Sequence, residues 1–153
     1  MAVYYLDSSA LVKRYVRESG SVWIESLFIP GAGHIVFIAA ITAVEVAAAI
    51  ARRARGGTIL PADAAAACAQ FRADLSVDYQ IVDLTSLVRS HAMLVAETHG
   101  LRAYDAVQLA SALAVHQERS TAGLPTLTFV SADTELNGVA AAEGLTVDDP
   151  NTH

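Results

Sequence analysis

Residues 3–20 read VYYLDSSALVKRYVRESG. The apolar run Val3–Leu6 has the length of a buried strand and lacks the alternation of a half-exposed one. From Ser8 onward, apolar residues recur at helical spacing, and Gly20 follows as a helix stop. A strand that passes directly into a helix favours parallel strands in one sheet. The stretch therefore predicts an α/β fold, with Asp7 at the junction of strand and helix.

The rest of the chain repeats this alternation. The other expected strands are Ile35–Ala39, Tyr79–Leu84, Leu127–Val130 and Leu145–Val147. The other expected helices are Ser21–Phe28, Thr42–Arg55, Pro61 to about Leu75, Ser86–Thr98, Tyr104–Glu118 and Thr134–Ala142. Such alternation implies a parallel sheet covered on both faces. We expect a single domain over residues 1–148 and a frayed tail, DPNTH, at 149–153.

Composition limits the class of protein. Of the 153 residues, 54% are hydrophobic, which suits one domain with a substantial core. The net charge of -6 argues against a broadly basic nucleic-acid binder, but not against an enzyme with local basic patches. The single cysteine, Cys68, excludes an internal disulfide framework. No secretory signal is recognisable, and Glu45 interrupts the most apolar stretch, so we expect a cytoplasmic protein.

Acidic residues follow several of the predicted strands. Asp7 follows the first, Glu45 lies one turn into the helix after the second, and Asp133 comes shortly after the fourth. Asp105 begins the helix that leads to the fourth strand. Ligands of parallel sheets bind beyond the carboxyl ends of the strands, so we expect these four acids to converge. Each acid alone could instead serve a helix N-terminus, as in the capping-box pattern from Thr42 to Glu45.

Convergent carboxylates repel one another, and such clusters usually hold a divalent cation. Oxygen ligands favour Mg²⁺ or Mn²⁺ over zinc. Such a cation can orient a phosphodiester, activate water and neutralise the leaving oxygen, whether one ion is bound or two. Ser9 and Ser131 could support the site by bonding a ligand carboxylate, although turn and cap serines would have the same pattern.

Four segments resemble the PIN-domain ribonucleases, and most closely the VapC toxins of bacterial toxin–antitoxin systems. These segments are LDSSALVKRYVRE, TAVEVA, LRAYDAVQLASAL and FVSADTEL, in an order and spacing that cover nearly the whole chain. By position, Asp7, Glu45, Asp105 and Asp133 match the acidic quartet of that family. The resemblance implies that these residues are catalytic and bind the metal.

The same resemblance implies a fold, an activity and partners. Ser9 and Ser131 match small hydroxyl positions of the family. The implied fold is a five-stranded parallel sheet of order 3-2-1-4-5 flanked by helices. The implied activity is Mg²⁺- or Mn²⁺-dependent endonucleolytic cleavage of RNA, with tRNA and rRNA as the usual targets. A VapB-type antitoxin and a toxin homodimer are the implied partners. A housekeeping RNA-processing nuclease and a non-catalytic binding module remain alternatives.

Two other enzyme classes also place acids at strand ends. A haloacid-dehalogenase-type phosphatase needs a second Asp two residues after the first, where this chain has Ser9. A receiver domain needs a lysine late in the chain, and the sole lysine is Lys13. Both patterns therefore argue against these classes.

Basic residues that could contact an RNA backbone lie on two predicted helices. They are Lys13, Arg14, Arg52 and Arg53. The second pair could equally complement a helix dipole on a solvated face. Trp23 could be core or could line a groove for an antitoxin helix.

Overall fold

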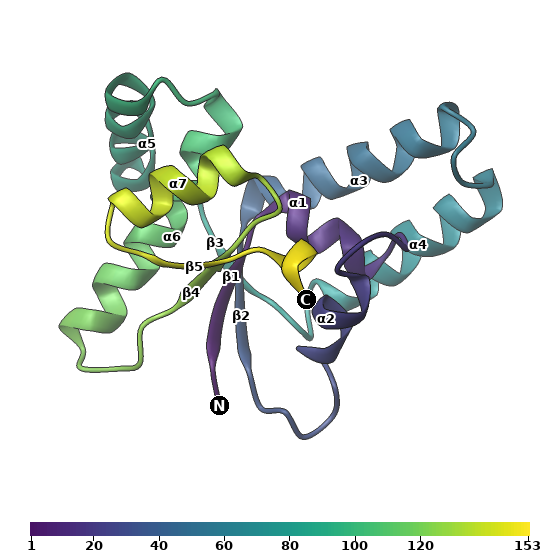
Figure 1. The fold of residues 1–153 in the computed structure, drawn as a ribbon, viewed down its shortest axis with the longest axis horizontal. Helices are drawn as coiled ribbons and strands as arrows, with labels where there is room; N and C mark the ends of the chain where they lie inside the picture. Colours follow the sequence, from purple (N-terminus) through teal and green to yellow (C-terminus); the bar gives the residue numbers. More distant parts are fainter.

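Five parallel strands form the centre of the molecule in the computed structural model, which describes all residues from 1 to 153 (Figure 1). The strands are β1 (Val3–Leu6), β2 (Ile35–Ala39), β3 (Gln80–Val82), β4 (Thr128–Val130) and β5 (Thr146–Asp148). Their order is β3-β2-β1-β4-β5, which confirms the predicted topology. Because β1 is the central strand, its carboxyl end lies at the middle of the sheet edge.

Helices follow nearly every strand. They are α1 (Ser8–Leu11), α2 (Ser21–Ser26), α3 (Ala40–Arg55), α4 (Pro61–Asp74), α5 (Ser86–His99), α6 (Ala103–Thr121) and α7 (Thr134–Ala142), with short 3-10 helices η1 (Val12–Arg14) and η2 (Pro150–Thr152). The antiparallel pair α3 and α4 projects to one side of the sheet, and α5, α6 and α7 lie on the other side (Figure 1). Every one of these helices is too short or too polar to span a lipid bilayer.

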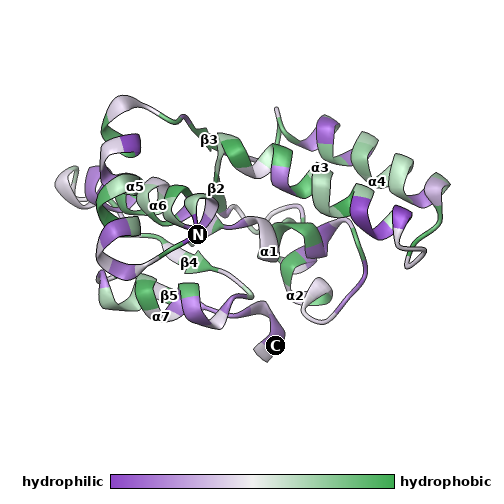
Figure 2. Cartoon of the chain, turned by 90° about the horizontal axis from the view of Figure 1, so that it is seen from above, coloured by the Kyte–Doolittle hydropathy of each residue, from purple (hydrophilic) through white to green (hydrophobic).

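Two hydrophobic cores cover the two faces of the sheet. Successive side chains of a strand point to opposite faces, and β1 shows this directly. Tyr5 packs on Phe129 in the core beneath α5, α6 and α7, whereas Leu6 and Ile38 belong to the core beneath α1 to α4. Hydrophobic residues occur along the strands and along every helix that surrounds the two cores (Figure 2). Burial on both faces explains why β1 and β2 are continuously apolar.

Several predicted helices differ in their boundaries, and two of them, the first helix and α3, bear on the site. The first one changes after Leu11 from α1 to the 3-10 turn of η1 and ends at Arg14. The helix α3 begins at Ala40 and not at Thr42, so Thr42 lies buried inside its first turn. The capping-box interpretation of Thr42 and Glu45 is therefore wrong, because the residue at the cap position is Ala39.

The C-terminal tail forms the short helix η2 and contacts the rest of the chain. Asp148 belongs to β5, and the buried Pro150 begins η2. The ring of His153 stacks on Trp23 with centroids 4.2 Å apart, and its Nε2 lies 2.9 Å from Oδ1 of Asp148. Trp23 is thus partly covered by the tail of its own chain. Apolar and aromatic contacts, which the polar sequence of the tail concealed, hold these residues in place.

Candidate functional site

Asp7 occupies the junction between β1 and α1. Its Oδ1 accepts hydrogen bonds from the backbone N–H of Ala10 at 2.9 Å and from the hydroxyl of Ser9 at 2.7 Å. Its Oδ2 accepts a third bond from the hydroxyl of Ser131 at 2.8 Å. The side chain therefore caps α1 and, in addition, binds hydroxyls from two separate elements.

Burial dominates the electrostatics of Asp7, whose exposed fraction is only 3%. Burial, together with the nearby charge of Glu45, raises the pKa of the Asp7 carboxyl from 3.8 to about 6, against the hydrogen bonds that favour ionisation. A cap on the protein surface would not need a buried carboxylate. An ionised Asp7 is costly in this position unless a positive charge approaches it.

Glu45 lies one turn into α3 and is held from two sides. Its Oε2 accepts a hydrogen bond from the hydroxyl of Ser8 at 2.6 Å, and its Oε1 accepts one from Nε2 of Gln108 at 3.1 Å. Gln108 is itself fixed, because its Oε1 accepts from the Tyr5 hydroxyl at 2.8 Å and its Nε2 donates to Thr42 at 2.9 Å. Burial raises the pKa of Tyr5 well above its ordinary value, so its hydroxyl remains a donor.

Asp105 and Asp133 face each other across the start of two helices. Asp105 lies in the first turn of α6, and Asp133 caps α7 by accepting from the N–H of Leu136 at 3.0 Å. Partial burial raises the pKa of Asp105, and the charges of Asp133 and Glu45 raise it further. Both acids line a cavity of about 250 Å³. The four predicted acids thus lie in one electrostatic neighbourhood at the carboxyl edge of the sheet.

The acids do not form a closed metal-binding shell. No group of three or more His, Cys, Asp or Glu side chains is arranged to hold a metal ion. Mg²⁺, however, usually binds through one or two carboxylates and keeps several of its waters. The donor set is carboxylate and hydroxyl oxygen, which suits Mg²⁺ or Mn²⁺. Burial raises the pKa of Asp7 and Asp105, and the repulsion among the acids adds to this effect; a cation would relieve that repulsion.

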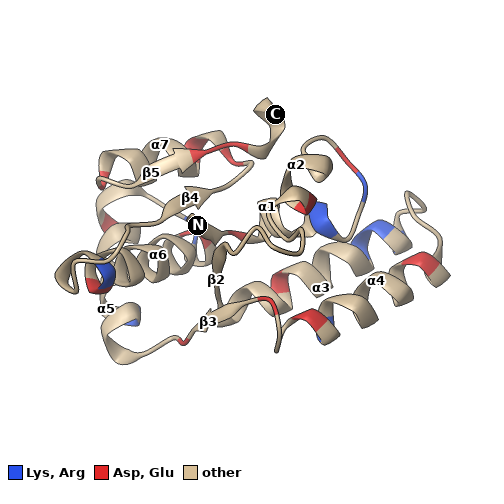
Figure 3. Cartoon of the chain, turned by 90° about the horizontal axis from the view of Figure 1, so that it is seen from below, with Lys and Arg blue, Asp and Glu red and all other residues tan.

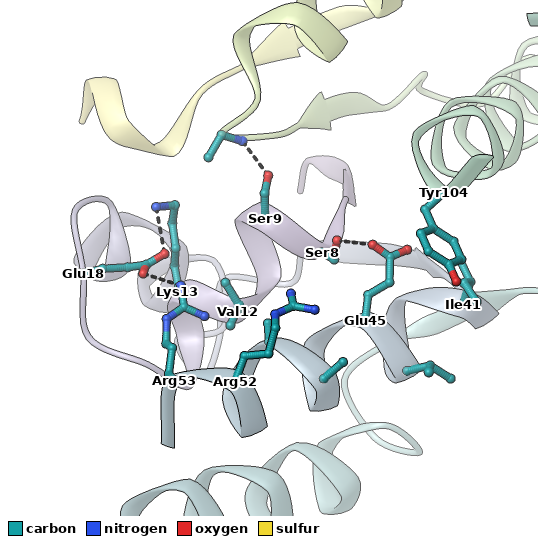
Figure 4. Close-up of a pocket in the computed structure, with 14 residues that line it drawn as sticks. Ser8, Ser9, Val12, Lys13, Glu18, Ile41, Glu45, Arg52, Arg53 and Tyr104 are labelled. Atoms are coloured by element: carbon teal, nitrogen blue, oxygen red, sulfur yellow. Dashed lines mark hydrogen bonds and ion pairs between the residues drawn. The ribbon is translucent and has the colours of Figure 1, made fainter. Parts of the chain in front are cut away.

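A cavity of about 670 Å³ opens beside Glu45. Its lining includes Ser8 and Ser9 from α1, Glu45 and Arg52 from α3, and Tyr104 from the start of α6. Figure 4 shows Glu45 between Ser8 and the ring of Tyr104, with Arg52 further along the same helix. The predicted site therefore has an open approach on the side of α3.

The predicted basic contacts differ in their availability. Glu18 binds both Lys13 Nζ, at 3.1 Å, and Arg53, at 2.7 Å, and Lys13 is buried. Arg52 is exposed and forms no ion pair. Lysine and arginine residues mark the segment after α1 and the half of α3 that lies away from the sheet (Figure 3).

Arg14 points elsewhere. It binds Asp78 at 2.6 Å and lies over the ring of Phe28, 3.8 Å from its centroid. These contacts join the N-terminal segment to the loop before β3. The structure therefore assigns Arg14 to packing and does not favour the predicted RNA contact.

Sequence reasoning assigned no role to Ser8, Gln108 and Tyr104. Gln108 follows Asp105 by three residues, a spacing that places both on one helical face. This spacing could have indicated that Gln108 lies near the acids. The position of Ser8 gave no such indication, because a serine at a helix start usually has a capping role.

Comparison with known proteins agrees with this geometry. A family model described as PIN domain matches residues 4–142. Ribonuclease VapC45 of Mycobacterium tuberculosis (strain CDC 1551 / Oshkosh) is 34% identical over 147 residues, which cover 96% of this chain and 95% of the relative.

Solved structures share the fold at lower identity. PAE2754 from Pyrobaculum aerophilum superposes with a TM-score of 0.63 and 22% identity, over 99% of this chain and 85% of the other. A toxin–antitoxin complex from Klebsiella pneumoniae gives a TM-score of 0.60 and 16% identity, over 96% and 97%. The chain therefore belongs to the PIN-domain family and, within it, to the VapC ribonucleases.

Proposed function

We propose that this protein is a metal-dependent endoribonuclease that hydrolyses RNA phosphodiester bonds. One observation carries the proposal: Asp7 is a buried carboxylate that binds two hydroxyls and is electrostatically coupled to Glu45 at the carboxyl edge of the sheet. A helix cap alone requires neither the burial nor the acidic neighbours. Membership of the PIN-domain family and the 34% identical ribonuclease support the same activity.

Mg²⁺ or Mn²⁺ is the proposed cofactor, and Asp7, Glu45, Asp105 and Asp133 are the residues that would hold it. When bound, the cation supplies Lewis acidity, an acidified water and charge neutralisation at the leaving oxygen. The structure's support for this assignment is chemical: the donors are oxygen atoms, and burial and mutual repulsion raise the pKa of Asp7 and Asp105.

The side chains around the acids would fix their orientation. Ser9 and Ser131 hold the two oxygens of Asp7, and Ser131 also accepts from the backbone N–H of Asp133 at 3.0 Å. Ser8 and Gln108 do the same for Glu45. Hydrogen-bond donors lower the pKa of a carboxyl, so Ser9 and Ser131 favour the ionised form of Asp7 that a cation requires. Such preorganisation reduces the reorganisation needed when substrate binds.

The biological role we propose is that of the toxin in a toxin–antitoxin pair, inhibited by a VapB-type antitoxin and acting as a homodimer. Support comes from the VapC relative and from the fold shared with the Klebsiella pneumoniae toxin–antitoxin complex. We expect a small neighbouring reading frame that encodes a protein with a DNA-binding fold, and we expect that protein to co-purify with this chain. A housekeeping nuclease would have no such neighbour.

Cleavage of structured RNA tests the proposed function directly. We expect the wild type to cut RNA in the presence of Mg²⁺ or Mn²⁺, and we expect EDTA to stop this cleavage. The variants Asp7→Asn and Asp105→Asn should both lack the activity. Asp83→Asn is a matched control, because Asp83 is an exposed acid directly after the edge strand β3. Induced expression should arrest growth in the wild type and the control only. Full activity of Asp7→Asn would refute the assigned site.

A further inference from the structure

We propose that Tyr104 and Arg52 form an RNA subsite beside the acids, in which an unpaired base stacks on Tyr104 and a backbone phosphate binds Arg52. This inference rests on the proposed function and specifies the substrate as a single-stranded segment of RNA. It starts from the cavity of about 670 Å³, whose lining includes both side chains and Glu45 (Figure 4).

One face of α3 forms the floor of this cavity. Ile41, Glu45, Ala48 and Arg52 recur at intervals of three and four residues, so they lie in one row along the helix. The eleven helical steps from Ile41 to Arg52 measure roughly 16 Å at the helical rise. The small side chain of Ala48, in the middle of the row, leaves space in the cavity above the helix. The row is longer than one nucleotide and suits a short extended strand.

Arg52 is the one basic lining residue whose charge is available. The cavity is lined by three basic residues, and Glu18 binds two of them, Lys13 and Arg53. Arg52 is exposed and has no acidic partner. In a chain with a net charge of -6, an isolated cation next to carboxylates provides a local point of attachment for a phosphate.

Tyr104 supplies an aromatic surface at the other end of the row. Its side chain is 60% exposed, and it directly precedes Asp105 on α6. Every other tyrosine of the chain is buried or partly buried. In Figure 4 its ring stands beside Ile41 and Glu45 at the cavity wall. A base that stacked on this ring would bring its own backbone close to the acids.

Stacking of this kind requires an unpaired base. Bases in a duplex already stack on their neighbours, whereas bases in loops and single strands can turn onto aromatic side chains. A Tyr–Arg pair carries no hydrogen-bond code for one base, so the subsite would select for strandedness more than for sequence. The inference therefore predicts cleavage in loops or single strands in preference to paired stems.

RNA binding can be measured without cleavage in the Asp7→Asn background with Mg²⁺ present. The probe is a fluorescently labelled single-stranded RNA of mixed sequence, and its annealed duplex is the comparison. We expect Tyr104→Ala to weaken binding of the single strand about tenfold, and Tyr104→Phe to restore it. We expect Arg52→Ala to lower the slope of log K against log salt by about one.

Two matched controls accompany these variants. Arg55→Ala removes an exposed cation of the same helix outside the cavity, and Leu87→Ala truncates an exposed apolar side chain on α5. Both should bind RNA like the parent. Equal affinity of Tyr104→Ala and the parent, equal binding of duplex and single strand, or no RNA binding by the parent would each overturn the subsite.

The failure of the subsite differs from failure of the proposed function. Cleavage is then compared in proteins that keep Asp7. If the wild type cuts RNA and Tyr104→Ala cuts it with an unchanged KM, the proposed nuclease function stands and the subsite proposal is wrong. If the wild type does not cut RNA but binds it in a way that depends on Tyr104, the RNA subsite stands and the proposed nuclease function is wrong. If the Tyr104 and Arg52 variants lose only antitoxin binding, the cavity is a protein interface and the proposal is wrong.

Discussion

The side-chain amide of Gln108 donates to Oε1 of Glu45 at 3.1 Å, and this bond connects the second turn of α6 to the acidic edge of the sheet. Gln108 is 1% exposed and is bound in turn by the hydroxyl of Tyr5. A buried amide with such partners has one orientation. Gln108 therefore acts as a positioning residue for Glu45.

Gln108→Ala should weaken Mn²⁺ binding about tenfold, because groups that orient metal ligands typically contribute that much to metal affinity. Ser8→Ala should have a similar effect through the other oxygen of Glu45, and it disturbs the core less because Ser8 is partly exposed. Titration with Mn²⁺, followed by electron paramagnetic resonance, measures the affinity. Gln117→Ala, an exposed amide on the same helix, serves as the control. Unchanged affinity in both Ser8→Ala and Gln108→Ala would contradict the positioning role.

Asp7→Asn should stabilise the metal-free protein near neutral pH. The pKa of Asp7 is raised from 3.8 in the unfolded chain to about 6 in the fold, so the folded state binds the proton more tightly. Its contribution to stability is therefore greatest below about pH 4 and is lost as the pH rises to about 6. The difference corresponds to about 3 kcal/mol. Asparagine can still accept from Ala10 and donate to Ser131, so the other interactions persist.

Urea unfolding in EDTA at a series of pH values measures this effect. The gain in unfolding free energy of Asp7→Asn over wild type should grow from pH 4 to pH 6 and stay constant above it. Added Mg²⁺ should stabilise the wild type and leave Asp7→Asn nearly unchanged. A gain that is independent of pH, or equal stabilisation of both proteins by Mg²⁺, would contradict the assignment.

Gly20→Ala should destabilise the fold by detaching the C-terminal tail. Gly20 has a φ of +82°, and an added Cβ would lie 2.5 Å from the carbonyl oxygen of Pro150. Gly31 has a φ of +91° but no atom within 4 Å of the added Cβ, so Gly31→Ala reports the backbone strain alone. We expect a loss of about 1 kcal/mol for Gly31→Ala and about 1–3 kcal/mol more for Gly20→Ala. Deletion of residues 149–153 should abolish the difference in urea unfolding, and a persistent difference would mean that the tail is not the cause.

Glu18→Gln should lower the stability because Glu18 neutralises two cations. Lys13 has only 6% of its side chain exposed, and a glutamine at position 18 could still accept a hydrogen bond but would leave the charge of Lys13 without a counterion. We expect a loss of about 1–3 kcal/mol in chemical unfolding. Glu25→Gln is the control, because its partner Arg17 is 69% exposed and such surface pairs contribute little. Equal losses in the two variants would show that the Glu18 cluster is no more than surface charge.

The sheet could be predicted because its strands have a simple pattern. Val3–Leu6 and Ile35–Ala39 are continuously apolar, as strands buried on both faces must be, and their boundaries agree with the prediction. The end of α5 at Gly100 could also be predicted from the sequence, because that residue adopts the left-handed conformation that glycine favours. Boundaries failed where tertiary contacts override local signals. Thr42 is drawn into α3 by its bond to Gln108, and the polar tail is held by Pro150 and the Trp23–His153 stack.

The sequence by itself determined the alternation of strands and helices, and with it the delivery of Asp7, Glu45, Asp105 and Asp133 toward one edge, since parallel strands end on the same side of a sheet. Tertiary structure alone decided which groups hold these acids and which charges remain free. Ser8 and Gln108 lie 37 and 63 residues from Glu45, and Lys13 and Arg53 reach Glu18 from different helices. Such contacts depend on distance and burial between elements, and neither quantity is expressed in local residue spacing.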